Sequence, residues 1–188
     1  MDRPEAIGSE SSMARVRIER RMAVAGVIGL GYVGLPLGAA IARAGFKTIG
    51  FDIDPQKPPL LNAGTSYIDA VKSEELGRLV ADERLSATSD MSGLSRCDVI
   101  VICVPTPLTR HREPDMTYIA ATSAAIARYL RAGQLVVLES TTYPGTTDEV
   151  VRPILEAGGM KSGRDFFLGF SPEREDPGNR EFETVTIR

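Results

Sequence analysis

A glycine-rich turn near the amino terminus is the part of the sequence best suited to chemistry. The run Gly29-Leu30-Gly31-Tyr32-Val33-Gly34 follows a short apolar segment and precedes a segment with helical spacing. In a G-x-G-x-x-G pattern, the first glycine permits a tight strand-to-helix turn and the second admits a pyrophosphate close to the backbone. The third glycine lets the helix pack on the sheet. Because the helix N-terminus also supplies N–H donors, this turn predicts a dinucleotide site.

An acidic residue after the next apolar run indicates which dinucleotide is bound. Asp52 lies 23 positions after Gly29, close to the roughly 20 expected for the residue that binds the adenosine ribose. A carboxylate accepts a hydrogen bond from the ribose 2′-hydroxyl and repels a 2′-phosphate, so we expect NAD rather than NADP. Lys57 works against this preference, because a nearby cation tolerates a phosphate. The alternative interpretation of Asp52 is a solvated acid in a turn.

A parallel sheet would bring these residues together, and the chain from Met22 onward has the pattern of one. Short apolar runs predict strands at 24–28, 48–51, 84–88, 99–104, 134–138 and 166–170, the third being the weakest. Helical spacing predicts helices at 33–44, 67–81, 116–131 and 146–157. We expect Gly45 to end the first helix and Asp115 to cap the third. The order predicts an α/β fold with a doubly wound parallel sheet (Rossmann) in a single domain.

Composition limits the partners and the compartment. The chain has 188 residues, a net charge of −3 and two cysteines, which gives no electrostatic reason to expect a nucleic acid or a membrane surface as partner. No apolar stretch approaches the roughly 18 residues of a membrane span, and no metal-ligand spacing is present. We therefore expect a cytoplasmic protein without a metal site. Residues 1–21, which are arginine-rich at 15–21, are expected to form a loose extension, and residues 22–188 the domain.

The tract 27–37, VIGLGYVGLPL, resembles the opening of the UDP-glucose/GDP-mannose dehydrogenase family. The resemblance runs from about Met22 to the last residue. It includes Asn62-Ala63-Gly64, Val104-Pro105-Thr106-Pro107, Glu139-Ser140-Thr141-Thr142 and Phe170-Ser171-Pro172-Glu173. It implies oxidation of the C6 hydroxymethyl group of a nucleotide sugar to a carboxylate with two NAD. Residues 106–108, 111–115, 142–147 and 171–179 are most similar to UDP-N-acetylglucosamine 6-dehydrogenases. The UDP-N-acetylmannosamine, UDP-N-acetylgalactosamine and UDP-glucose enzymes are the alternatives.

The resemblance also implies roles for individual residues. Thr106 would lie along the cofactor towards the nicotinamide, Thr141 would help to hold a catalytic water, and Glu173 would assist proton transfer or hydrolysis near C6. The blander alternatives are a loop start, a turn cap and a surface acid. The implied cofactor-binding set is Gly29, Gly31, Tyr32, Val33, Gly34, Asp52, Lys57, Thr106 and Thr141, and the implied catalytic pair is Thr141 and Glu173. His111, the single histidine, is expected to be a solvated loop residue.

The family's covalent chemistry depends on a cysteine in a glycine-rich segment that has no match in this sequence. Cys103 lies in an apolar run without a neighbouring His or Lys, which favours packing over nucleophilic attack. We therefore expect this chain to be the amino-terminal part of the enzyme and to be inactive alone. The full-length protein is expected to bind a UDP-sugar and to form a homodimer. The rival hypotheses are a dehydrogenase of hydroxy acids and a stand-alone NAD-binding module.

Overall fold

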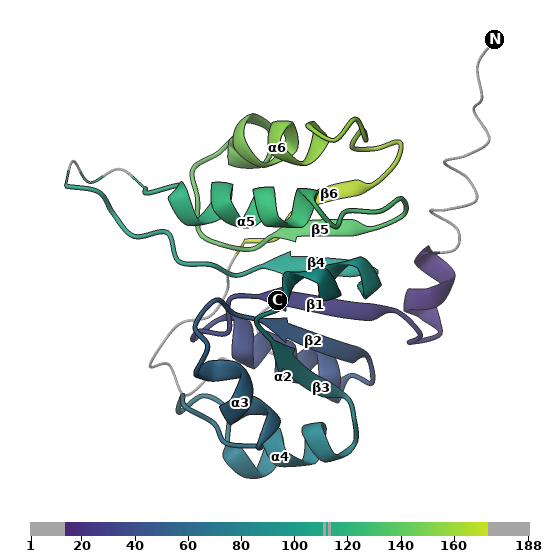
Figure 1. Cartoon of the computed structure of the whole chain (residues 1–188), viewed down its shortest axis with the longest axis vertical. Helices are drawn as coiled ribbons and strands as arrows, with labels where there is room; N and C mark the ends of the chain where they lie inside the picture. Colours follow the sequence, from purple (N-terminus) through teal and green to yellow (C-terminus); the bar gives the residue numbers. More distant parts are fainter. Residues whose placement is uncertain (1–13, 111, 113, 173–188) are drawn as a thin grey trace.

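The computed structural model describes residues 14–110, 112 and 114–172, and it has a six-stranded parallel sheet at its centre (Figure 1). The strands are β1 (Val24–Ile28), β2 (Lys47–Phe51), β3 (Leu85–Thr88), β4 (Val99–Ile102), β5 (Leu135–Leu138) and β6 (Phe167–Phe170). Their order across the sheet is β3-β2-β1-β4-β5-β6. The chain therefore builds outward from β1 in one direction and then from β4 in the other, and the expected doubly wound fold is confirmed.

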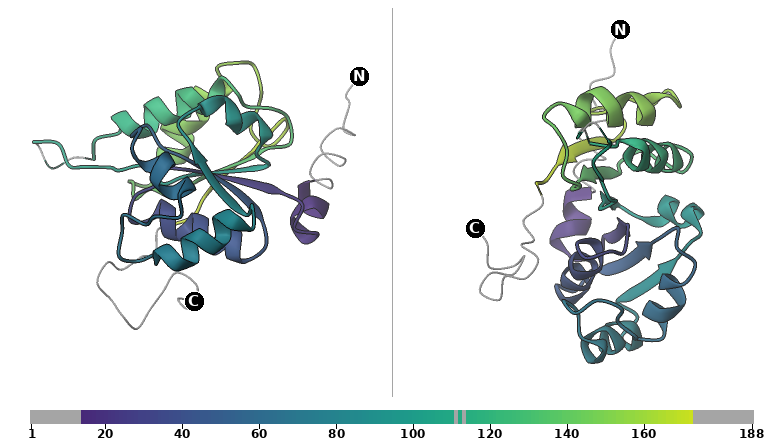
Figure 2. Two further views of the ribbon diagram at one scale, coloured as in Figure 1. Left: turned by 60° about the horizontal axis from the view of Figure 1, so that its bottom comes forward. Right: turned by 90° about the vertical axis from the view of Figure 1, so that its left-hand side faces the viewer.

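Helices cover both faces of the sheet (Figure 2). They are α2 (Gly34–Arg43), α3 (Lys57–Asn62), α4 (Ser73–Ala81), the 3-10 helix η1 (Met91–Arg96), α5 (Thr117–Ala127), the π-helix η2 (Thr147–Val151) and α6 (Arg152–Glu156). Gly45 follows α2 with φ +99°, and Asp115 accepts a hydrogen bond from the N–H of Thr117 at the start of α5. Gly45 therefore ends α2 as expected, whereas Asp115 lies one residue before the N-cap Met116 and bonds to the first helical N–H instead of occupying the N-cap itself.

Two elements differ from expectation in the segment between β2 and β3. The sequence predicts one helix over 67–81, whereas α4 begins only at Ser73 and a separate helix, α3, precedes it. Residues 67–72 are not helical, because the N–H and the carbonyl of Ile68 bond to the hydroxyl of Ser66 and Lys72 has an extended backbone before α4. Because of Pro58 and Pro59, the sequence does not predict α3, yet proline is tolerated in the first turn of a helix.

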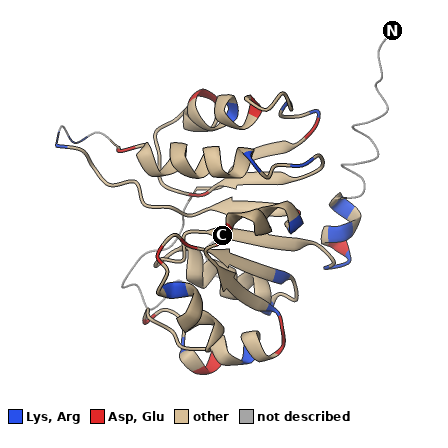
Figure 3. Ribbon diagram, viewed as in Figure 1, with Lys and Arg blue, Asp and Glu red and all other residues tan. Residues whose placement is uncertain are grey.

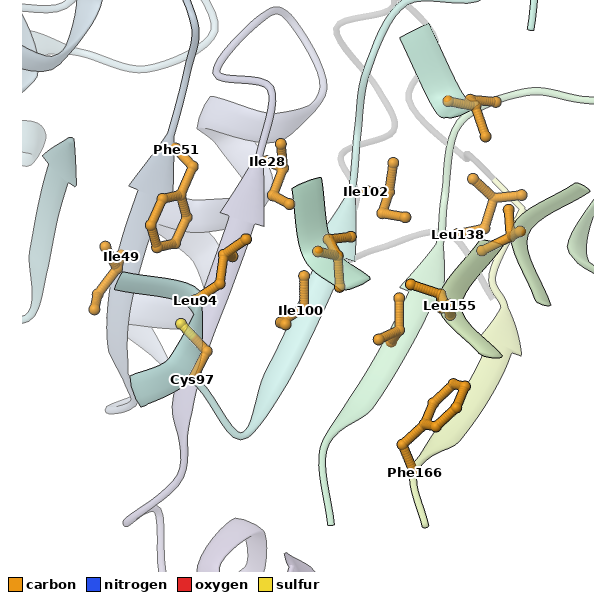
Figure 4. Close-up of a cluster of buried hydrophobic side chains, with 14 residues drawn as sticks. Ile28, Ile49, Phe51, Leu94, Cys97, Ile100, Ile102, Leu138, Leu155 and Phe166 are labelled. Carbon is orange, nitrogen blue, oxygen red and sulfur yellow. The ribbon is translucent and has the colours of Figure 1, made fainter. Parts of the chain in front are cut away.

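The core is formed by the two apolar faces of the sheet. On one face, residues of β2, β1, β4 and β5 pack against η1, α5 and α6, as in the cluster of Phe51, Ile100 and Leu155 (Figure 4). On the other face, α2 and α4 cover β1, β2 and β3, with Leu35 and Leu76 fully buried. Charged residues lie on the helices and connections, and the strands carry few of them (Figure 3). This pattern is typical of a parallel sheet that is buried on both faces.

A polar cluster closes the amino-terminal edge of the sheet. Asp98, whose side chain is 10% exposed, accepts hydrogen bonds from the Val24 N–H and from the guanidinium groups of Arg17 and Arg131. Although partial burial would raise its pKa, these hydrogen bonds and cations hold the pKa of Asp98 below its ordinary value. The fully buried Gln134 donates to the carbonyl groups of Leu94 and Cys97, which ties η1 to β4 and β5.

The amino-terminal extension has more structure than the sequence suggests. Of the residues expected to be loose, 1–13 lie outside the described part of the chain. Residues 14–19 are helical, and Arg17 reaches Asp98 with a separation of 3.0 Å between the charged groups. The extension is therefore anchored to the domain from about Arg17 onward. None of the helices in the described ranges has the length and apolar character that crossing a bilayer requires.

Replacing Asp98 with Asn should lower the free energy of unfolding by roughly 1.5–3 kcal/mol at neutral pH, since hydrogen bonds to a charged group are lost. Because the pKa of Asp98 is depressed in the folded state, its contribution is present above its unfolded pKa of about 3.9 and lost as pH falls through the lower folded value. Urea unfolding of both proteins at several pH values measures this difference. The exposed Asp82→Asn is the control. An equal loss at pH 7 and pH 2.5 would contradict the prediction.

Candidate functional site

A cleft of about 670 Å³ opens at the carboxyl edge of the sheet, where the strand order reverses between β1 and β4. Its walls are the glycine turn after β1, the residues that follow β2, β4 and β5, and one face of α5. The parallel register aligns Ile28 with Phe51 on one side and with Ile102 on the other, so the three strand ends lie at one level. Open α/β sheets bind ligands at this position.

The glycine turn has the geometry that a phosphate-binding backbone needs. Gly29 has φ +93°, and a Cβ there would lie 2.5 Å from the carbonyl oxygen of Cys103. A Cβ on Gly34 would lie 1.8 Å from the Gly29 oxygen, so the first turn of α2 can pack here only without a side chain. A Cβ on Gly31 would meet no atom within 4 Å. Gly31 therefore faces open space in the cleft, while the other two glycines serve the packing.

The start of α2 supplies donors to the same space. The N-cap residue Val33 makes no side-chain capping bond, and no acidic residue lies in the first turn. A helix without a capping side chain presents backbone N–H groups and the positive end of its dipole to whatever lies in front of it. Tyr32 and Val33 also line the cleft, and Tyr32 is 68% exposed. The residues present fit the pyrophosphate of a dinucleotide.

Asp52 joins the turn to the end of β2. Its Oδ2 accepts from the N–H of Leu30 at 2.8 Å and from the Nζ of Lys57 at 2.8 Å, and its Oδ1 accepts from the N–H of Asp54 at 2.9 Å. The residue is 6% exposed and still lines the cleft. Asp52 and Lys57 therefore lie together, and the cation is paired with the carboxylate rather than pointing alone into the cleft.

The loops after β4 and β5 meet at the other end of the cleft. The hydroxyl of Thr106 donates to the backbone oxygen of Thr141 at 2.7 Å, and the hydroxyl of Ser140 donates to the backbone oxygen of Val104 at 2.8 Å. These bonds cross-link the two loops and set Thr106 and Thr141 side by side in the cleft wall. The structure thus brings together every predicted cofactor-binding residue except Gly34, which packs behind the turn.

One predicted catalytic residue, Glu173, lies outside the described residues, as does His111, which is expected to be a solvated loop residue. Cys103 lines the cleft, yet it is only 9% exposed, and its sulfur lies 4.0 Å from the Glu139 Oε2. Burial raises the pKa of Cys97 to about 12, and this residue lies at the opposite edge of the sheet. Among the described residues, no group of acidic, Cys or His side chains is arranged to hold a metal ion.

Several lining residues were not predicted from the sequence. Ile53 follows Asp52 and is 77% exposed, and Met91 starts η1. Helix α5 contributes one face, formed by Tyr118, Ala121, Thr122 and Ala125. A signal was present, because α5 is apolar or small on nearly all sides and a helix with one solvated face would be more polar. One side packs into the core and the other forms the cleft wall.

Comparison with known proteins identifies the family. Residues 22–188 match the description "UDP-glucose/GDP-mannose dehydrogenase family, NAD binding domain". The chain belongs to this family. NAD is accordingly the cofactor of the domain, as the acid after β2 predicts.

Among the family's members, the chain is 38% identical over 163 residues to UDP-N-acetyl-D-glucosamine 6-dehydrogenase of Pseudomonas aeruginosa. The aligned residues cover 86% of the chain and 38% of that protein. It is 33% identical over 153 residues to UDP-N-acetyl-D-mannosamine dehydrogenase of Pyrococcus horikoshii, covering 81% and 36%. The crystal structure of a ternary complex of GDP-mannose dehydrogenase from Pseudomonas aeruginosa superimposes with a TM-score of 0.76 and 34% identity, covering 80% and 36%. The chain therefore spans little more than a third of these relatives.

Two glycine substitutions should separate binding from folding. Gly31→Ala adds a methyl group where nothing lies within 4 Å, so the domain should keep its stability and lose most of its affinity for NAD. Gly34→Ala places the methyl against the Gly29 carbonyl and should destabilise the domain, by about 1–3 kcal/mol as for other overpacked sites. Thermal unfolding and calorimetric titration with NAD measure the two effects. Undiminished NAD affinity in Gly31→Ala would refute the placement of the pyrophosphate.

Proposed function

We propose that this chain is the cofactor-binding part of a UDP-N-acetylhexosamine 6-dehydrogenase that oxidises the C6 hydroxymethyl group of UDP-N-acetylglucosamine to a carboxylate. The observation that carries the proposal is the cleft at the point where the strand order reverses. The uncapped N-terminus of α2 lies at one end of it, and the loops after β4 and β5, joined by the bond from Thr106 to Thr141, lie at the other. Bound NAD would supply the hydride acceptor for each oxidation.

The residues of the cleft divide by position into two groups. Near β2, Asp52 and Lys57 would hold the adenosine ribose, and the turn formed by Gly29, Gly31, Tyr32 and Val33 would surround the pyrophosphate, with Gly34 behind it. Near β4 and β5, Thr106 would lie beside the nicotinamide. The cleft is continuous between the two groups, as an extended dinucleotide requires.

Thr141 and Glu173 are the proposed catalytic residues. Thr141 is exposed and lines the cleft, and its backbone oxygen is already bonded to Thr106, so its hydroxyl can hold a water close to the nicotinamide end. Glu173 follows Pro172, shortly after β6, and would assist proton transfer near C6. Both assignments rest on the resemblance of their motifs to the family.

The choice of N-acetylglucosamine over its epimers rests on similarity. The relative named for this sugar is 38% identical, and the one named for N-acetylmannosamine is 33% identical. The loop motifs 106–108 and 142–147 favour the same substrate. A homodimer for the full-length protein, and its place in the cytoplasm, remain predictions. An assay of the full-length protein against UDP-N-acetylglucosamine, its epimers and UDP-glucose tests the substrate directly, and a preference for UDP-glucose would refute it.

Replacing Asp52 with Asn should weaken NAD binding about tenfold and narrow the preference over NADP, because a charged hydrogen bond and the repulsion of a 2′-phosphate are both lost. Lys57, released from its ion pair at 2.8 Å, should add attraction for the phosphate. Titration of both dinucleotides by calorimetry measures the change. Asp69→Asn, which removes an exposed carboxylate outside the cleft wall, should leave both affinities unchanged. Unaltered NAD affinity in Asp52→Asn would remove the ribose assignment.

The 188-residue chain should bind NAD without oxidising a sugar. At a hundredfold excess over its dissociation constant, NAD should stabilise the fold by about 2.7 kcal/mol, which raises the melting temperature by roughly 5–10 °C. Catalysis should be absent because neither Cys97 nor Cys103 is exposed and activated as a nucleophile for the aldehyde stage. Thermal unfolding with NAD and NADH absorbance with UDP-N-acetylglucosamine measure the two claims. Steady NADH formation would show that the chain carries its own reactive group.

A further inference from the structure

The connection between α3 and α4, residues 63–72, reaches the glycine turn with a side chain that the dinucleotide motif does not include. The hydroxyl of Tyr67 donates to the backbone oxygen of Leu30 at 3.0 Å. Leu30 is the residue between Gly29 and Gly31, and Tyr67 is not among the residues that line the cleft. Tyr67 therefore acts on the turn from outside the ligand space.

This bond completes a clamp on Leu30. The N–H of Leu30 donates to Asp52 at 2.8 Å, and its side chain is fully buried so close to Gly50 that a Cβ there would lie 2.6 Å from it. The N–H belongs to the peptide unit that joins Leu30 to Gly29, and the carbonyl belongs to the unit that joins it to Gly31. Two successive peptide planes of the turn are therefore held, one by Asp52 and the other by Tyr67.

The direction of the second plane determines the direction of a donor. A trans peptide is planar, so its N–H points opposite to its carbonyl oxygen. When Tyr67 holds the Leu30 oxygen, it also sets the direction of the Gly31 N–H. Gly31 is the glycine with open space beside it in the cleft. Rotation of this one plane would turn that N–H away from a phosphate.

The connection is itself fixed in place by the motif Asn62-Ala63-Gly64. The side chain of Asn62 accepts from the N–H of Ala87 at 2.8 Å and donates to its carbonyl at 2.9 Å, which binds the end of α3 to β3. Gly64 has φ +71°, and a Cβ on it would lie 2.7 Å from the Cα of Gly77 in α4. The motif therefore sets where the chain leaves α3, three residues before Tyr67.

The hydroxyl of Tyr67 can act as a hydrogen-bond donor over a wide pH range. Burial, followed by the nearby charges of Asp52 and Asp54, raises the pKa of Tyr67 far above its ordinary value. The group therefore stays protonated at any pH at which such an enzyme works. The ring packs against the cluster that contains Leu30 and Leu76, so the hydroxyl is presented from a side chain that is half-buried on the domain.

We propose that Tyr67 is a positioning residue of the cofactor site: its hydroxyl orients the Leu30–Gly31 peptide so that the Gly31 N–H is preset for the pyrophosphate of NAD. Asn62-Ala63-Gly64 serves to place Tyr67. The inference rests on the proposed function, since it requires the glycine turn to hold the dinucleotide. Preorganised donors bind more tightly because less order is lost when the ligand arrives.

The test is Tyr67→Phe, which removes the hydroxyl and keeps the ring. Loss of one neutral hydrogen bond predicts that the dissociation constants of NAD and of ADP-ribose rise about three- to tenfold, measured by calorimetry well below the melting temperature. Tyr129→Phe is the matched control, because Tyr129 is also half-buried and lies after α5, towards the amino-terminal edge of the sheet. A role in stability alone would lower the melting temperature and leave both dissociation constants unchanged, which would overturn the proposal.

Amide hydrogen exchange without NAD tests the clamp independently of ligand binding. In Tyr67→Phe the Leu30 amide should exchange faster than in the parent, whereas the Gly50 amide in β2 should not change. Unchanged exchange at Leu30 would overturn the positioning role even if the parent binds NAD. If the parent chain binds no NAD but the Leu30 amide responds, the clamp stands and the proposed function of the turn is wrong, together with the purpose assigned to Tyr67.

Discussion

The cleft at the carboxyl edge of the sheet depends on how closely the first turn of α2 approaches the ends of β1 and β4. Gly29 passes beside the Cys103 carbonyl, and Gly34 lies against Gly29, at separations that admit no side chain. This approach brings the N-terminus of α2 to the level at which β2, β1 and β4 end together. The cleft exists because the N-terminus of α2 lies at the same height as the ends of these strands. A longer distance between Gly34 and Gly29 would move the N–H donors of α2 away from the strand ends.

The two edges of the sheet carry different kinds of polar group. At the amino-terminal edge, Asp98, Arg131 and Gln134 are bonded to one another or to backbone, and they hold η1, β4 and β5 together. At the carboxyl edge, backbone N–H groups and hydroxyl groups face a cleft. The polar groups of the amino-terminal edge therefore bond within the domain, whereas the start of α2 at the carboxyl edge has no capping side chain.

The fold was largely predictable because the central strands β1, β2 and β4 are buried on both faces and read as short apolar runs. The segment 57–72 was not, because its conformation follows from Pro58-Pro59 at a helix start and from the side chain of Ser66, which competes with the backbone of a helix. The glycine turn and Asp52 were predictable because their spacing is set within one strand-turn-helix-strand unit. Tyr118 and Tyr67 were not, since long-range packing brings them to the site.

The hydrogen bonds of Asp52 give a reason for cofactor selectivity beyond its charge. An ionised carboxylate has about four acceptor positions, and three are taken by the N–H groups of Leu30, Asp54 and Lys57. The remaining position can accept a hydrogen bond from a ribose hydroxyl, which brings a proton. A 2′-phosphate brings none, and it would be repelled by the carboxylate. The network that fixes the turn therefore also leaves Asp52 able to accept from one more donor, so the geometry of the turn and the expected preference for NAD have the same structural origin.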